Sequence, residues 1–144
     1  MGMKRVVDLP LKTICEVMKE FKTSVKVGVP AEDVYAALTN PFAIEIWTGS
    51  KAKMSTEEGS EFELWDGDIA GRNIKFVENK MIVQEWYFGE EEPSIVTIKL
   101  TAKSNVRTEI YVHQTNIPDE AYENIAGGWE EDYIASLCEF LEGE

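Results

Sequence analysis

The chain has 144 residues, of which 44% are hydrophobic, and this length and composition are typical of one globular domain with a single core. Its 27 acidic and 14 basic residues give a formal net charge of −13, which would repel a phosphate backbone and argues against nucleic acid as a partner. No stretch approaches the roughly 20 apolar residues of a membrane span, and the start lacks the apolar run of a signal peptide. We therefore expect a soluble, cytoplasmic protein with no membrane span. We interpret the acidic residues as a solvated surface that keeps the protein soluble; the alternative interpretation is that they attract a basic surface of a partner protein.

Residues 1–22 fit the pattern of the remaining chain least well. Apolar residues between Ile14 and Phe21 have helical spacing, but the same segment could form an irregular strand that continues into Thr23. We predict an N-terminal extension over residues 1–22, packed on a single domain that spans residues 23–144.

A strand that ends near Val29 is followed by a helix that Pro30 opens. Glu32 and Asp33 lie in the first turn of this helix, where the helix dipole favours negative charge. The helix should stop before Pro41, because the residue that precedes a proline disfavours the α conformation.

An antiparallel meander is predicted from Lys51 onward, because turn residues recur about every 8–12 positions. Apolar side chains alternate between these turns, so one face of the sheet should be buried and the other should carry charged residues. Trp65 and Tyr87 fall on the polar side, where we interpret them as scattered exposed aromatics. The residues expected to point inward are Phe62, Leu64, Ile74, Phe76, Ile82, Gln84, Trp86, Val96, Ile98, Leu100, Ile110 and Val112.

One long helical pattern begins near Asp119 and should cover the apolar face of this sheet. Gly127 and Gly128 interrupt the pattern. They are explained either by a bend or a late start of the helix, or by a close approach of its backbone to a strand or a ligand. The apolar stripe of the helix consists of Tyr122, Ile125, Ala126, Trp129, Tyr133, Leu137, Phe140 and Leu141.

Several motifs resemble one known family when they are taken in order: residues 34–39, 47–49, 62–71, 82–86 and 128–129. They resemble the SRPBCC superfamily, in the branch related to the C-terminal domain of the activator of the heat-shock protein 90 ATPase. The resemblance implies an α+β helix-grip fold, in which a curved antiparallel sheet wraps around a long C-terminal helix and two short helices follow the first strand. It also implies a cavity, and it offers a chaperone-associated role in the stress response as a possible function.

Catalytic and metal-binding residues are scarce. Cys15 and Cys138 are the only cysteines and His113 is the single histidine, so we predict reduced thiols, no metal site and no cofactor. A pair of Cys138 with His113 is formally available, but the alternation that turns Gln114 inward turns His113 toward solvent. We predict no catalytic residue and no enzyme.

Two carboxylates also invite comparison with an acid/base pair, because Asp66 and Asp68 flank Gly67. A general acid needs an apolar setting that raises its pKa, whereas a hairpin tip offers water. The Asp-Gly spacing therefore indicates a turn.

Binding of a small molecule fits the residue types better, since such pockets are mostly apolar with a few polar groups. The alternative is that the same aromatic side chains fill a solid core. We predict a non-catalytic protein that holds a small hydrophobic or amphipathic molecule between the sheet and the C-terminal helix. The alternative function is the chaperone-associated interaction module that the resemblance implies. The candidate ligand-binding residues are Trp47, Phe62, Leu64, Ile74, Phe76, Trp86, Ile98, Gln114, Trp129 and Tyr133.

Overall fold

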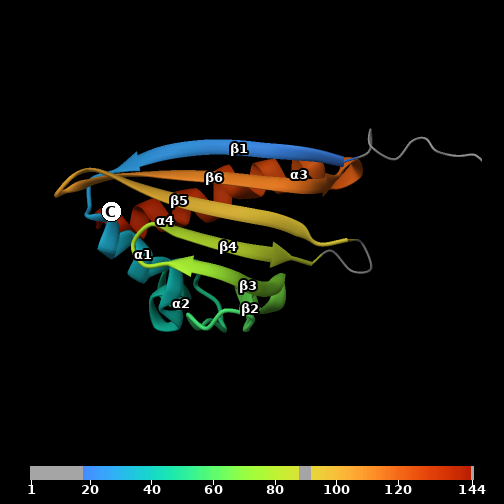
Figure 1. Cartoon of the computed structure of the whole chain (residues 1–144), viewed down its shortest axis with the longest axis horizontal. Helices are drawn as coiled ribbons and strands as arrows, with labels where there is room; N and C mark the ends of the chain where they lie inside the picture. The colour runs from blue at the N-terminus through green and yellow to red at the C-terminus, as the bar shows by residue number, and fades with distance from the viewer. Residues whose placement is uncertain (1–17, 88–91, 144) are drawn as a thin grey trace, which may run out of the picture.

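A six-stranded antiparallel sheet forms one layer of the computed structural model, which describes residues 18–87 and 92–143 (Figure 1). The strand order is β1-β6-β5-β4-β3-β2, so the first strand pairs with the last one and the others follow as a meander. The C-terminal helical segments lie along one face of this sheet. The strands are β1 (Met18–Val27), β2 (Glu61–Leu64), β3 (Ile69–Val77), β4 (Met81–Trp86), β5 (Ser94–Ser104) and β6 (Arg107–Pro118).

Two short helices follow β1, as predicted. Asn40 separates them: it ends the first helix, and its Oδ1 accepts a hydrogen bond of 2.9 Å from the backbone N–H of Phe42 in the second. The second helix ends at Gly49, whose φ of 74° is left-handed. Among the described residues no helix is long and apolar enough to cross a membrane. The helical segments are α1 (Ala31–Thr39), α2 (Pro41–Thr48), η2 (Trp65–Gly67), η3 (Asp119–Ala121), α3 (Tyr122–Gly128), η4 (Trp129–Tyr133) and α4 (Ile134–Glu142).

Strand β1 includes part of the segment that we predicted to be an extension. Residues 18–22 pair with β6, where Phe21 lies opposite Gln114. The remainder of the predicted extension, residues 1–17, lies outside the described residues.

The long C-terminal helix is interrupted by one π-helical turn, η4, between α3 and α4. In this turn the backbone N–H of Ile134 bonds to the carbonyl of Trp129. Gly127 and Gly128 lie just before it, and a Cβ atom on either glycine would meet nothing within 4 Å. The backbone at these glycines therefore makes no close approach to a strand. The helix also begins well before them, so a late start is wrong, and the interpretations that remain are the local change of helical geometry at η4 and a close approach to a ligand.

The inner face of the sheet follows the predicted alternation with one exception in β3. A β-bulge between Asn73 and Lys75 shifts the register against β4. As a result Asn73 is fully buried, whereas Ile74 is 39% exposed. The prediction that Ile74 points inward is wrong, because Ile74 is the extra residue of the bulge: Asn73 pairs with Gln84 and Lys75 with Val83, so Ile74 has no partner on β4. Phe76, beyond the bulge, is half-buried and packs against the core.

Candidate functional site

All four tryptophans of the chain gather around one tyrosine, although they come from distant segments. Trp86 and Trp129 stack with ring centroids 5.0 Å apart and planes 15° from parallel. Tyr133 lies one helical turn beyond Trp129, with their centroids 4.4 Å apart. We call this set the tryptophan cluster, and it consists of Trp47, Trp65, Trp86, Trp129 and Tyr133.

Tyr133 is the centre of the tryptophan cluster, because its ring contacts those of all four tryptophans. Its side chain is 6% exposed. Burial in these apolar surroundings raises the pKa of the Tyr133 phenol well above its usual value. The phenol is therefore neutral in the folded protein at physiological pH.

Trp65 joins the cluster through an unusual backbone. It has a φ of 52° and the next residue, Asp66, has a φ of 57°, so two consecutive residues other than glycine are left-handed. This turn follows the end of β2 and places the centroid of the Trp65 ring 5.9 Å from the centroid of the Tyr133 ring. Such backbone costs about 1–3 kcal/mol per residue and concentrates at functional sites.

A first indole–amide pair joins the cluster to the sheet. The indole Nε1 of Trp86 donates to Gln84 Oε1 at 2.9 Å, and Gln84 Nε2 donates to Asn73 Oδ1 at 2.9 Å. Asn73 Nδ2 in turn donates to Ser60 Oγ at 3.1 Å and to the carbonyl of Ser55 at 3.3 Å. The polar atoms of Gln84 are therefore satisfied in the interior.

A second indole–amide pair joins η4 to β6, and one polar atom of its amide has no hydrogen-bond partner within the described part of the chain. Trp129 Nε1 donates to Gln114 Oε1 at 2.7 Å, which fixes the orientation of the amide. Gln114 is fully buried, and its Nε2 has no hydrogen-bond partner among the described residues. A buried donor without an acceptor costs about 1–3 kcal/mol.

A cleft of about 560 Å³ opens beside the tryptophan cluster, between the helix and the ends of β3 and β4. Five of its eleven lining residues are aromatic, and Gly128 lines it with free space where a side chain would be. A volume of this size suits a small organic molecule. The residues that line the cleft are Trp65, Asp68, Ile69, Trp86, Tyr87, Asn124, Ile125, Gly128, Trp129, Asp132 and Tyr133.

Three of the predicted ligand-binding residues line this cleft: Trp86, Trp129 and Tyr133. Trp47 does not line it, although it contacts Tyr133 with centroids 5.1 Å apart and donates from Nε1 to the carbonyl of Ala37. The other predicted residues are placed elsewhere: Phe62, Leu64, Ile98 and Gln114 are buried in the core, Phe76 is half-buried, and Ile74 is exposed.

Sequence reasoning assigned Trp65 and Tyr87 to the outer face of the sheet as incidental aromatics, and the structure places both at the cleft. Strand alternation stops applying at Leu64, where the left-handed turn begins, and Tyr87 lies just beyond the end of β4. The Asp-Gly turn at residues 66–67 was a usable sign that alternation ends before it. Asp68 was assigned to a turn rather than to a site, and Asp132 was not predicted at a site.

His113 lies on the outer face of the sheet, as alternation predicts, with 29% of its side chain exposed. Its Nε2 lies 2.6 Å from Glu20 Oε1, and this hydrogen bond lowers the pKa of the Glu20 carboxyl. Cys138 belongs to α4 and packs against the core on the inner face. Burial, with a contribution from Glu142, raises the pKa of the Cys138 thiol, which opposes formation of a reactive thiolate.

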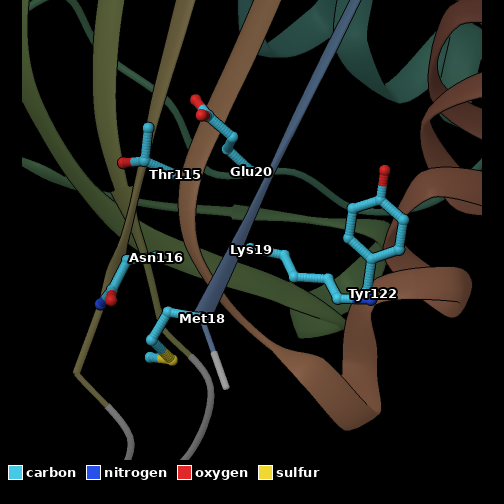
Figure 2. Close-up of a pocket in the computed structure, with 6 residues that line it drawn as sticks. All are labelled: Met18, Lys19, Glu20, Thr115, Asn116 and Tyr122. Carbon is cyan, nitrogen blue, oxygen red and sulfur yellow. The ribbon is translucent and has the colours of Figure 1, made fainter. Parts of the chain in front are cut away.

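A second, broader hollow of about 710 Å³ lies where β1 begins and β6 ends, beside Tyr122 (Figure 2). None of its six lining side chains is fully buried. The ammonium of Lys19 is already paired with Asp119 at 3.0 Å and lies 5.0 Å from the centre of the Tyr122 ring. This hollow is shallow and its one cation is engaged, so the cleft at the tryptophan cluster is the better candidate site.

Comparison with known proteins supports the fold and gives the family. The family described as "Activator of Hsp90 ATPase homolog 1-like protein" matches residues 28–142. The activator of 90 kDa heat shock protein ATPase homolog of Dictyostelium discoideum is 28% identical over 105 residues, which cover 71% of this chain and 27% of that protein. Homolog 2 from Mus musculus is 24% identical over 114 residues, which cover 77% of this chain and 34% of that protein. The chain thus spans roughly a third or less of these relatives.

A solved structure agrees with the architecture. The crystal structure of an HSP90 activator from Plasmodium falciparum superposes with a TM-score of 0.80 at 24% identity, covering 86% of this chain and 96% of that one. This likeness shows the helix-grip fold, and the match over residues 28–142 shows the family. The chain belongs to the Activator of Hsp90 ATPase homolog 1-like family, within the SRPBCC superfamily.

Proposed function

We propose that this domain binds a small hydrophobic or amphipathic molecule in the cleft beside the tryptophan cluster. The observation that carries the proposal is the cleft of about 560 Å³ with Trp86, Trp129 and Tyr133 in its wall. Aromatic faces in a concave site supply most of the contact area in small-molecule pockets. The strained turn at Trp65 adds support, because it holds a further ring at the same cleft.

Binding is proposed without catalysis. The two side chains that could form a nucleophile–base pair, Cys138 and His113, belong to opposite faces of the sheet. The raised pKa of the Cys138 thiol further disfavours a nucleophilic role.

The proposal can be tested with two matched glycine substitutions. Gly128 lines the cleft and Gly127 does not, yet both have helical backbone and free space at the Cβ position. Leucine at either position should be tolerated, because leucine is favoured over glycine in a helix by about 0.8 kcal/mol. A neutral apolar dye such as Nile red is titrated into each variant, and dye emission and tryptophan quenching are recorded.

We expect Gly128→Leu to fill the cleft and to weaken dye binding at least tenfold, while Gly127→Leu binds the dye like the parent. Both variants should melt at or above the parent temperature, so a loss of binding cannot be attributed to unfolding. Equal binding by the two variants, or no saturable binding by the parent protein, would contradict the proposal.

A chaperone-associated module is the second candidate, and family membership favours it because the curated relatives are named activators of the 90 kDa heat shock protein ATPase. The surface that suits this role is on α2, where Phe42 and Ile46 lie one turn apart and are 77% and 69% exposed. Stimulation of a purified heat-shock protein 90 ATPase by this chain, lost in a Phe42→Ser, Ile46→Ser double variant, would support it. An unchanged ATPase rate would argue against it.

A further inference from the structure

The charge of the cleft is as distinctive as its aromatic walls. Two carboxylates, Asp68 and Asp132, stand among the lining residues, and no lysine or arginine does. Neither carboxylate forms an ion pair within the described residues, whereas four other pairs are present there. Asp132 lies in η4 together with the aromatic residues Trp129 and Tyr133, whereas Asp68 follows η2.

We infer that the ligand of this cleft is a hydrophobic organic cation, namely an alkyl- or arylammonium compound. This inference rests on the proposed function and narrows it to one chemical class. Aromatic rings have a negative face, which attracts an ammonium group that lies within about 6 Å of the ring centre. Carboxylates at the opening add attraction for the same charge, and the whole chain, at −13, adds a field of the same sign.

One basic residue close to this surface does not reverse its charge. Arg72 lies beside Tyr87, but its Nε is 3.9 Å from Glu85 Oε1, and the pKa of its guanidinium is raised by Tyr87 and by acidic neighbours. The helical segments α3 and η4, which form the other wall, contain no lysine or arginine. An anionic ligand such as a fatty acid would therefore enter against the field of the cleft.

Three probes of similar shape separate the effect of charge from the effect of apolar contact. Phenyltrimethylammonium is cationic, tert-butylbenzene is its neutral isostere, and benzenesulfonate is an anion of similar size. Each is titrated into the purified full chain, with tryptophan fluorescence and calorimetry as readouts, because all four tryptophans lie in the cluster. We expect the cation to bind about tenfold tighter than the neutral probe, and the anion not to bind. Added salt should weaken the binding of the cation and leave the binding of the neutral probe unchanged.

Replacing each of the two aspartates with asparagine gives a second test of the preference for cations. Asp68→Asn and Asp132→Asn should each weaken binding of the cation about two- to fivefold, because exposed charge pairs contribute modestly. Binding of tert-butylbenzene should stay unchanged. Glu131→Gln is the matched control, since Glu131 is exposed and adjacent to Asp132 but does not line the cleft. It removes the same charge and should leave both affinities unchanged.

The outcomes separate the inference from the function on which it rests. If the cation and the neutral probe bind equally, and Gly128→Leu abolishes both, the cleft binds apolar ligands but the preference for cations is wrong. Preference for benzenesulfonate, or an equal loss in Glu131→Gln and Asp132→Asn, would also overturn the inference. If no probe binds to the parent chain, the inference and the proposed function both fail.

Discussion

The two indole–amide pairs on the inner face of the sheet have the same parts and different surroundings. On β4, Gln84 accepts from Trp86 and donates to Asn73, so a chain of hydrogen bonds continues to Ser60 at the surface. On β6, Gln114 accepts from Trp129 and its own N–H₂ group has no partner in the part of the chain that the structure describes. The stacked indoles hold the pairs together.

This difference shows how one sheet can combine a pair whose polar atoms are all satisfied with a pair that leaves one unsatisfied. The β4 pair consists of sheet residues in a closed network, and such a network specifies one arrangement. The β6 pair includes Trp129, which opens the π-helical turn and lines the cleft. π-Helical turns are frequent at functional sites. The unsatisfied donor therefore lies on the side of the cluster where the helix is irregular and the surface is open.

Truncation of the indoles measures what the two pairs share, and it should give the largest effect. Trp86→Ala and Trp129→Ala each remove a large buried side chain, and such losses cost about 3–5 kcal/mol. We expect the two costs to be similar, because each substitution newly unpairs one buried oxygen, Oε1 of Gln114 or Oε1 of Gln84. Urea unfolding followed by circular dichroism measures both values.

Trp129→Phe provides the control for this comparison, since it keeps an aromatic ring but removes the indole N–H. It should cost less than Trp129→Ala. A Trp129→Ala variant that melts within a degree or two of the parent would contradict the placement of this ring in the core.

Substitution of the two glutamines tests directly whether the two indole–amide pairs differ in hydrogen bonding. Gln84→Leu leaves Trp86 Nε1 and Asn73 Oδ1 without their partners, at about 1–3 kcal/mol for each buried group. Gln114→Leu leaves only Trp129 Nε1 unpaired and removes an amide that is already half unsatisfied. We expect Gln84→Leu to be the more destabilising by at least about 1 kcal/mol in chemical denaturation.

A double-mutant cycle of Gln84→Leu with Trp86→Phe checks that the loss comes from the indole–amide bond. Equal destabilisation by Gln84→Leu and Gln114→Leu would show that Gln114 Nε2 has an acceptor, such as a buried water, and that the two pairs are equivalent.

The sequence predicts the fold far better than the site, and the two indole–amide pairs show why. Alternation placed Gln84 and Gln114 on the inner face, and helical spacing placed Trp129 and Tyr133 against them. These placements follow from the side-chain repeat of 2 residues in a strand and 3.6 residues in a helix, which holds throughout a regular element. The same rule failed at Ile74, because a bulge adds one residue without a clear mark in the sequence.

The cleft was harder to predict, because it forms where regular elements end. Trp65 lies in a left-handed turn, Tyr87 follows the last residue of β4, and Gly128 precedes the π-helical turn. Neither periodicity gives a side-chain direction at such positions. The prediction of a cavity at Phe62 and Gln114 placed it deeper than the cleft lies, since both residues are fully buried.

Titration of Tyr133 tests whether the centre of the tryptophan cluster, where the two pairs meet, is dry, and it should give the smallest effect. Tyr133 lies against both Trp86 and Trp129, and burial raises the pKa of its phenol above the usual value of 10.0. The phenol of the unfolded chain ionises first as the pH rises, so above pH 10 the folded state binds the extra proton and stability falls. The loss of stability from this one group should reach about 1.4 kcal/mol at pH 11, and it should be absent below pH 9 or so.

The variant Tyr133→Phe should flatten this alkaline loss of stability. Part of the loss will remain, because burial also raises the pKa of the Tyr35 phenol. Urea unfolding of the parent and Tyr133→Phe from pH 8 to 11 measures the difference. If the two curves run parallel throughout, the phenol ionises equally well in the folded protein, so water reaches it through the cleft and the centre of the tryptophan cluster is not dry.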